Sequence, residues 1–91
     1  MLIKYTKNFL NKLEEIISES DYMLRYEKGN FRPGYCLLKD KKVAIVSKYY
    51  PLEGKINTLL ELVNDIHPDI IQLSDRNKKL YLEITQTKLQ I

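Results

Sequence analysis

The stretch YCLLKDKKVAIVS, residues 35–47, places two apolar segments on either side of a charged tetrapeptide. This arrangement predicts two strands, residues 35–39 and 43–47, joined through Asp40-Lys41. With a two-residue turn, the opposed pairs are Lys39 and Lys42, Leu38 and Val43, Leu37 and Ala44, Cys36 and Ile45, and Tyr35 and Val46. One face of the hairpin is then mostly apolar, and the other is wholly apolar, formed by Cys36, Leu38, Val43 and Ile45. Both faces therefore need cover, from helices or from a second chain.

The chain on either side of this hairpin completes an α+β pattern. Residues 22–27 alternate like a strand, and two turn signals, Gly29-Asn30 and Pro33-Gly34, connect them to residue 35. Apolar residues at helical spacing predict one helix within residues 3–19 and a second from Pro51 to about residue 65. Residues 70–73 are expected to form a short extended piece.

A last helix is expected after Ser74, which suits an N-cap, although Leu80, Leu82 and Ile84 also alternate as strand residues do. The predicted order is helix, three-stranded antiparallel β-meander, helix, helix, with the first two helices on the apolar face of the sheet. The 91 residues, 44% hydrophobic and 30% charged, suit a single compact domain covering residues 1–91.

The sequence indicates a cytoplasmic protein with no membrane partner. It contains no stretch of about 18 apolar residues and no apolar segment typical of a signal peptide. Its one cysteine, Cys36, cannot form an internal disulfide, which agrees with a reducing compartment.

Residues suited to catalysis are scarce. A structural zinc site needs about four Cys or His ligands, whereas the chain offers only Cys36 and His67. The three glycines match no phosphate-binding fingerprint. Carboxylates such as Glu53 and Glu61 are explained by solvated helix faces. The sequence therefore predicts a protein that is not an enzyme, with no catalytic residue, metal, cofactor or small-molecule ligand.

Basic residues are concentrated in the middle of the chain. Residues 22–50 contain seven Lys or Arg and only two acids, Glu27 and Asp40. Interleaved with aromatic residues, they have the composition of a surface that neutralises phosphates and stacks bases. Lysines near a hairpin also keep a protein soluble, and tyrosines are common in strands, so the same composition is typical of a solvated hairpin. The candidate binding surface consists of Arg25, Lys28, Phe31, Arg32, Lys39, Lys41, Lys42, Lys48, Tyr49 and Tyr50.

Part of this region resembles a known group of proteins. The pattern consists of RYEKGNF at residues 25–31, Gly34-Tyr35-Cys36, Lys41-Lys42-Val43, and a following helix with Glu53, Ile56 and Leu59. In this pattern the chain resembles a family of small bacterial proteins of unassigned function. The resemblance implies a family but no activity.

The order of helix, short sheet and helix is also similar to that of small HExxH metallopeptidases. On that pattern the motif positions fall at Leu60, Glu61 and Asn64, so only the glutamate matches and both histidine ligands are missing. The likeness implies a degenerate, non-catalytic relative.

Three hypotheses follow from the sequence. The leading one is a small non-enzymatic interaction module that forms a homodimer, because the second sheet face is apolar and Tyr49, Tyr50 and Tyr81 accompany it. The second is a nucleic-acid-binding protein that uses the basic aromatic hairpin. The third is the degenerate peptidase relative.

Overall fold

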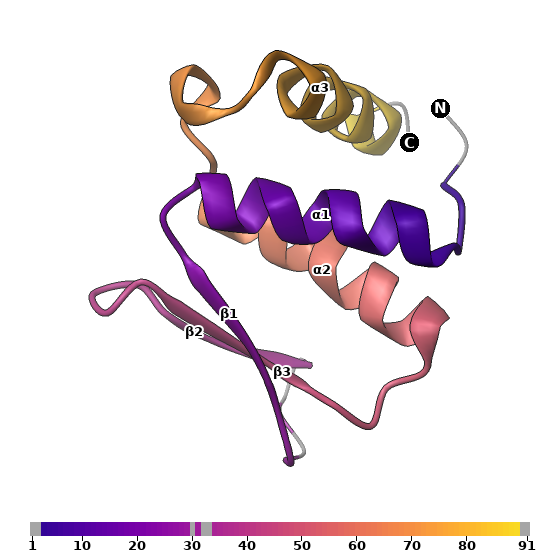
Figure 1. The fold of residues 1–91 in the computed structure, drawn as a ribbon, viewed down its shortest axis with the longest axis vertical. Coiled ribbons are helices and arrows are strands. Elements are labelled where there is room, and N and C mark those ends of the chain that lie inside the picture. Colours follow the sequence, from indigo (N-terminus) through magenta and orange to yellow (C-terminus); the bar gives the residue numbers. More distant parts are fainter. Residues whose placement is uncertain (1–2, 30, 32–33, 90–91) are drawn as a thin grey trace.

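The predicted hairpin forms, and its strands pair in the predicted register. In the computed structural model, which describes residues 3–29, 31 and 34–89, β2 (Tyr35–Leu38) lies antiparallel to β3 (Val43–Ser47). Cys36 faces Ile45 and Leu37 faces Ala44. The other elements are α1 (Lys7–Glu19), β1 (Met23–Glu27), α2 (Leu52–Ile66), the 3-10 helix η1 (Ile70–Gln72) and α3 (Asp75–Leu89) (Figure 1).

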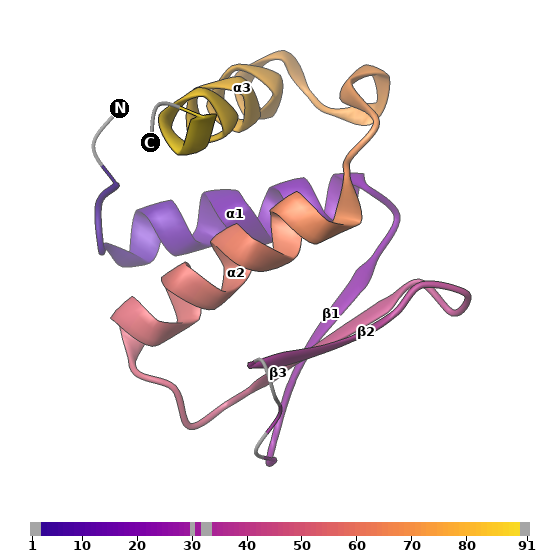
Figure 2. The ribbon, with the colours of Figure 1, turned by 180° about the vertical axis from the view of Figure 1, so that it is seen from behind.

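The sheet is mixed, so the predicted antiparallel meander is wrong. Its strand order is β1-β3-β2, and β1 runs parallel to β3, with Met23 beside Val43 and Tyr26 beside Val46. The sequence of β3 is nearly all apolar, which suits a strand with neighbours on both edges. β1 and β2 follow each other in the chain, but they lie on the two edges of the sheet with β3 between them (Figure 2).

The connection between β1 and β2 uses glycine near both of its ends. Gly29 has a φ of +154° and Gly34 a φ of +141°, values that residues with a side chain rarely adopt. At Gly29 an added Cβ would also lie 2.7 Å from the Phe31 ring, which therefore packs on this glycine. Asn30 and Pro33, the other predicted turn residues, lie outside the described residues.

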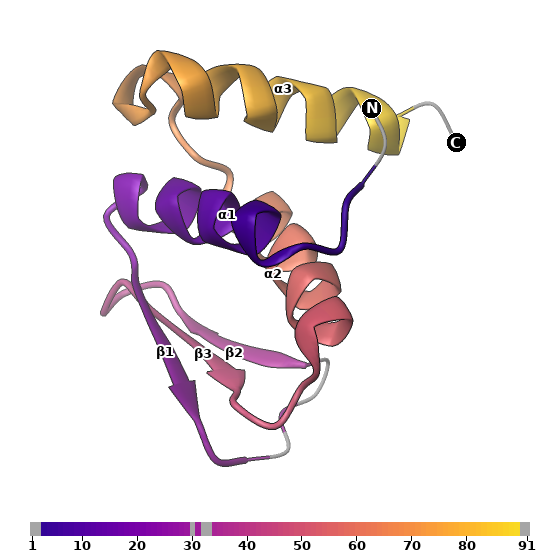
Figure 3. The same ribbon diagram turned by 45° about the vertical axis from the view of Figure 1, so that its right-hand side comes forward.

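α1 and α2 lie on one face of the sheet, and none of the described helices lies on the other (Figures 1 and 3). The prediction that helices cover the Cys36, Leu38, Val43 and Ile45 face is wrong. The parallel register aligns the apolar side of β1 with the opposite face of the hairpin, so that this face has the larger apolar surface to bury. The covered residues are Leu24, Tyr26, Tyr35, Leu37, Ala44 and Val46.

α1 begins later than its apolar pattern because Thr6 caps it. The Thr6 Oγ1 atom accepts a hydrogen bond from the Phe9 N–H at 3.1 Å, which satisfies one free donor of the first turn. Tyr5 stays outside the helix, and its hydroxyl donates to Asn57 of α2 at 2.9 Å. α2 follows Pro51 as predicted and extends to Ile66, after which His67 adopts a φ of +53°.

α3 is a helix and lies beside α1 on the side away from the sheet (Figure 3). Ser74 caps it as predicted, since the Ser74 Oγ accepts from the Asn77 N–H at 3.3 Å. The predicted extended piece before it is instead the 3-10 helix η1, because the Asp69 carboxylate accepts from the Ile71 N–H at 3.1 Å. Within the described part of the chain, no helix has the length and apolarity needed to cross a bilayer.

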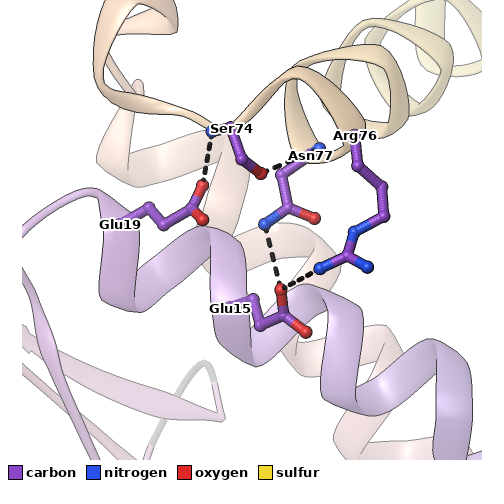
Figure 4. A network of polar contacts seen from close by, with 5 residues as sticks. All are labelled: Glu15, Glu19, Ser74, Arg76 and Asn77. Carbon is purple, nitrogen blue, oxygen red and sulfur yellow. Dashed lines mark hydrogen bonds and ion pairs between the residues drawn. The ribbon is translucent and has the colours of Figure 1, made fainter.

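Two glutamates of α1 hold the start of α3 (Figure 4). The Glu19 carboxylate accepts from the Ser74 N–H at 2.8 Å. The Glu15 carboxylate accepts from Arg76 Nη2 at 3.2 Å and from Asn77 Nδ2 at 3.3 Å. Burial alone raises the pKa of Glu19, but the hydrogen bonds from Ser74 and Asn77 and the charge of Arg76 outweigh it, so that the pKa lies below its usual value of 4.5.

Replacing Glu19 by Gln tests this contact through its pH dependence. Because the pKa of Glu19 is lowered on folding, its contribution to stability is complete above pH 4.5 and is lost as the pH falls through the folded pKa. We expect Glu19→Gln to be less stable than the parent protein at pH 7, by an amount that shrinks toward pH 3. Urea denaturation across this range measures the difference, and a difference that does not change with pH would contradict the role of the ionised carboxylate.

Candidate functional site

The candidate binding surface predicted from the sequence is divided between the two ends of the sheet. Lys39, Lys41 and Lys42 occupy the turn between β2 and β3, at the end where β1 begins. The opposite end, where β1 and β3 finish, carries Lys28, Phe31, Lys48 and Tyr49. Strands of five residues separate the two groups by about 16 Å.

Several members of the predicted surface are already engaged within the chain. Arg25 lies on β1 between the two groups, and its Nε is 2.7 Å from a carboxylate oxygen of Glu27. Lys42 places its Nζ 5.0 Å from the centre of the Tyr22 ring, a distance suited to a cation–π contact. Tyr50 is half-buried and packs against the core. These contacts leave fewer free cations than the composition suggests.

The basic residues therefore form two separate groups among the residues that the structure describes. A nucleic acid that contacted both groups would have to follow the full length of the strands. Lys48 has its Nζ 5.6 Å from the centre of the Tyr49 ring, so this pair is the part of the predicted surface that combines a cation with an exposed aromatic. Arg32 lies outside the described residues. Nucleic-acid binding stays a prediction.

The face of the sheet opposite the helices is a second candidate site, and it is apolar. We call it the outer sheet face; it is formed by Met23, Cys36, Leu38, Val43 and Ile45, with Arg25 and Glu27 on the same side of β1. Met23 is 62% exposed and Leu38 is 36% exposed, whereas the other three apolar residues are half-buried. Cys36 therefore lies at this surface and not in the core, where the apolar pattern of the hairpin would place it.

Two tyrosines on the inner face join the sheet to the helices. The Tyr26 hydroxyl donates to the Glu14 carboxylate of α1 at 2.6 Å, and the Tyr35 hydroxyl donates to the Asp65 carboxylate of α2. Burial raises the pKa of both phenols well above the usual value, and each neighbouring carboxylate raises it further. Both hydroxyls therefore stay protonated and act as donors, which makes them structural clamps and poor bases.

The residues that would correspond to an HExxH motif do not gather at one site. Leu60 is half-buried against the core, whereas Glu61 and Asn64 of α2 are exposed. In residues 3–29, 31 and 34–89, no group of three or more His, Cys, Asp or Glu side chains is placed to hold a metal ion. No protein-family model, no curated protein and no solved structure matches the chain. Both resemblances inferred from the sequence stay predictions.

A spectrophotometric titration of the tyrosines tests the two clamps. The raised phenol pKa values mean that the hydrogen bonds stabilise the fold below pH about 10, and that this stability is lost as the pH rises further. We expect part of the phenolate absorbance to appear only well above pH 10. Tyr26→Phe and Tyr35→Phe should each reduce that late fraction, because each removes one of the two phenols that donate to a carboxylate. Ionisation of all seven tyrosines in one early transition of the folded protein would contradict the assignment.

Proposed function

We propose that this protein is a small, non-enzymatic interaction module that forms a homodimer through the outer sheet face. The observation that carries the proposal is the one-sided packing of the sheet, with helices on one face and exposed Met23 and Leu38 on the other. Large apolar side chains gathered on an open sheet face are a feature of protein contacts. Of the three tyrosines that the sequence associates with this contact, Tyr50 and Tyr81 pack against the core, which leaves Tyr49 exposed.

A second copy of the chain is the occupant that best fits this face. A two-fold axis brings the same patch of both copies together, so the patch must be complementary to itself. The charged side chains on the outer sheet face are one cation and one carboxylate, Arg25 and Glu27. In a two-fold pair each copy offers both signs, so that Arg25 of one copy can bind Glu27 of the other without leaving a charge uncompensated.

The size of the face sets the expected affinity. Three strands of four or five residues cover about 14 Å by 16 Å, which is less than the roughly 800 Å² per partner of a standard interface. A contact of roughly 220 Å² per partner lies below the range of standard interfaces, and it is weak and reversible. The proposal therefore concerns a dimer that forms at micromolar concentrations and above, on the order of 8 kcal/mol or less in binding free energy.

Sedimentation equilibrium with matched isoleucine variants tests the proposal. Ile45→Lys places a charge in the middle of the outer sheet face, and we expect it to weaken dimerisation at least tenfold. Ile71→Lys makes the same change at a residue that is 87% exposed on η1, and it should leave the dimer unaffected. Circular dichroism establishes that both variants are folded.

A second variant protects the test against misfolding. Met23→Lys alters an exposed side chain of β1, and it should also weaken the dimer while leaving the helical signal unchanged. A parent protein that stays monomeric at several hundred micromolar would overturn the proposal. So would equal weakening by the Ile45 and Ile71 variants.

A further inference from the structure

The hydrogen bonds between β1 and β3 fix the direction of every backbone group in the sheet. The Met23 N–H donates to the Lys42 carbonyl at 2.8 Å, and the Lys48 N–H donates to the Glu27 carbonyl at 3.0 Å. In this parallel ladder the even-numbered residues of β3 direct their N–H and C=O groups toward β1. Backbone groups alternate along a strand, so the odd-numbered residues of β3 direct theirs toward β2.

The free edge of β2 therefore carries the backbone groups of Tyr35 and Leu37. Val43 and Ile45 of β3 align with Leu38 and Cys36, and these are the residues of β2 that form hydrogen-bonded pairs with β3. The N–H and C=O groups of Tyr35 and Leu37 point the other way. Because β2 is an edge strand, they point to the side on which the sheet has no further strand.

The sequence of β2 lacks the features that keep strand edges from pairing. Charged side chains and proline are common devices of this kind. β1, the other edge strand, contains Arg25 and Glu27, whereas β2 reads Tyr-Cys-Leu-Leu. The helices also leave this edge open: Leu37 faces them but is only half-buried, while Ala44 of the central strand, which faces the same way, is fully buried.

A second copy of the chain fits this edge about a two-fold axis at Cys36. In an antiparallel pair with this axis, Tyr35 of each copy lies opposite Leu37 of the other, and both residues exchange N–H and C=O groups. All the outward backbone groups of the strand are then used. Moving the axis to Leu37 would set Tyr35 opposite Lys39, which has already left the strand for the turn.

Edge pairing also enlarges the outer sheet face. Two copies joined in this way form one continuous sheet, with three strands from each copy. The apolar outer face doubles to roughly 440 Å², which is closer to the size of a stable interface than the face of one copy.

We propose that β2 of one copy pairs antiparallel with β2 of a second copy, with Cys36 of both copies at the two-fold axis. This contact goes beyond the proposed dimer, because it uses backbone groups at the sheet edge and not the side chains of the outer sheet face. Neither contact requires the other.

Disulfide formation at Cys36 reports the edge pair selectively. Directly opposed residues that do not share hydrogen bonds have Cα atoms about 4.5 Å apart, a distance that a disulfide can bridge. Sheets stacked face to face lie about 10 Å apart, which is too far. Glutathione disulfide serves as the oxidant: the two Cys36 thiols form one S–S bond, and the oxidant is reduced to two molecules of glutathione. We expect crosslinking of the parent protein at several hundred micromolar.

Two variants of Leu37 separate edge pairing from random collision. Leu37→Pro removes an N–H that β3 does not use, a position where edge strands tolerate proline. Leu37→Ala shortens the same side chain but keeps the N–H. We expect Leu37→Pro to crosslink about tenfold more slowly than Leu37→Ala, because the change removes a donor from both copies. Circular dichroism establishes that both variants are folded. Equal crosslinking rates in the two variants would overturn the proposal.

Amide hydrogen exchange tests the same pairing in the unaltered sequence. Exchange of the Tyr35 and Leu37 N–H groups should slow as the protein concentration rises, and rates that do not depend on concentration would overturn the proposal. Met23→Lys distinguishes the two contacts, because it weakens the outer-face dimer but leaves the edge of β2 intact. It should leave both the crosslinking and the exchange unchanged. Loss of both signals in Met23→Lys would contradict a separate edge contact.

Discussion

The fold depends on how Val46 is placed between two tyrosines. Tyr26 of β1 and Tyr35 of β2 both align with this residue of the central strand, and each donates its hydroxyl to a carboxylate, one on α1 and the other on α2. Val46 itself is fully buried beneath the helices. The two edge strands thus each hold one helix over the same face of the sheet. Because both helices are attached to that face, the opposite face of the sheet is open to solvent or to a partner.

This attachment gives the molecule three layers, which are the sheet, the pair α1 and α2, and α3. The sheet presents an apolar outer face, and α3 covers the far side of α1 (Figure 3). α1 and α3 are joined by the contacts of Glu15 with Arg76 and Asn77, which lie more than sixty residues further along the chain.

Local sequence signals predicted the elements well and their arrangement poorly. The 35–47 hairpin, its register and the Ser74 cap depend on neighbouring residues, and these predictions are confirmed. The order of the strands depends on how much apolar surface the three strands bury together, which no single strand reveals. Connections that contain glycine also allow more than one route from one strand to the next. The basic residues are close together in sequence but lie at opposite ends of strands. The burial of Asn77 could not be predicted from the sequence, since it results from α3 docking on α1.

The claim that the outer sheet face joins two copies is tested most directly by isotope-filtered nuclear Overhauser spectroscopy on a mixture of ¹³C-labelled and unlabelled protein. This experiment detects only contacts between copies, and it is carried out at a concentration where the dimer is populated. We expect intermolecular signals from the methyl groups of Val43, Ile45 and Leu38, and none from buried residues of α1 and α2 such as Leu13 and Leu59. Intermolecular signals confined to the helices, with none from the sheet, would contradict the account.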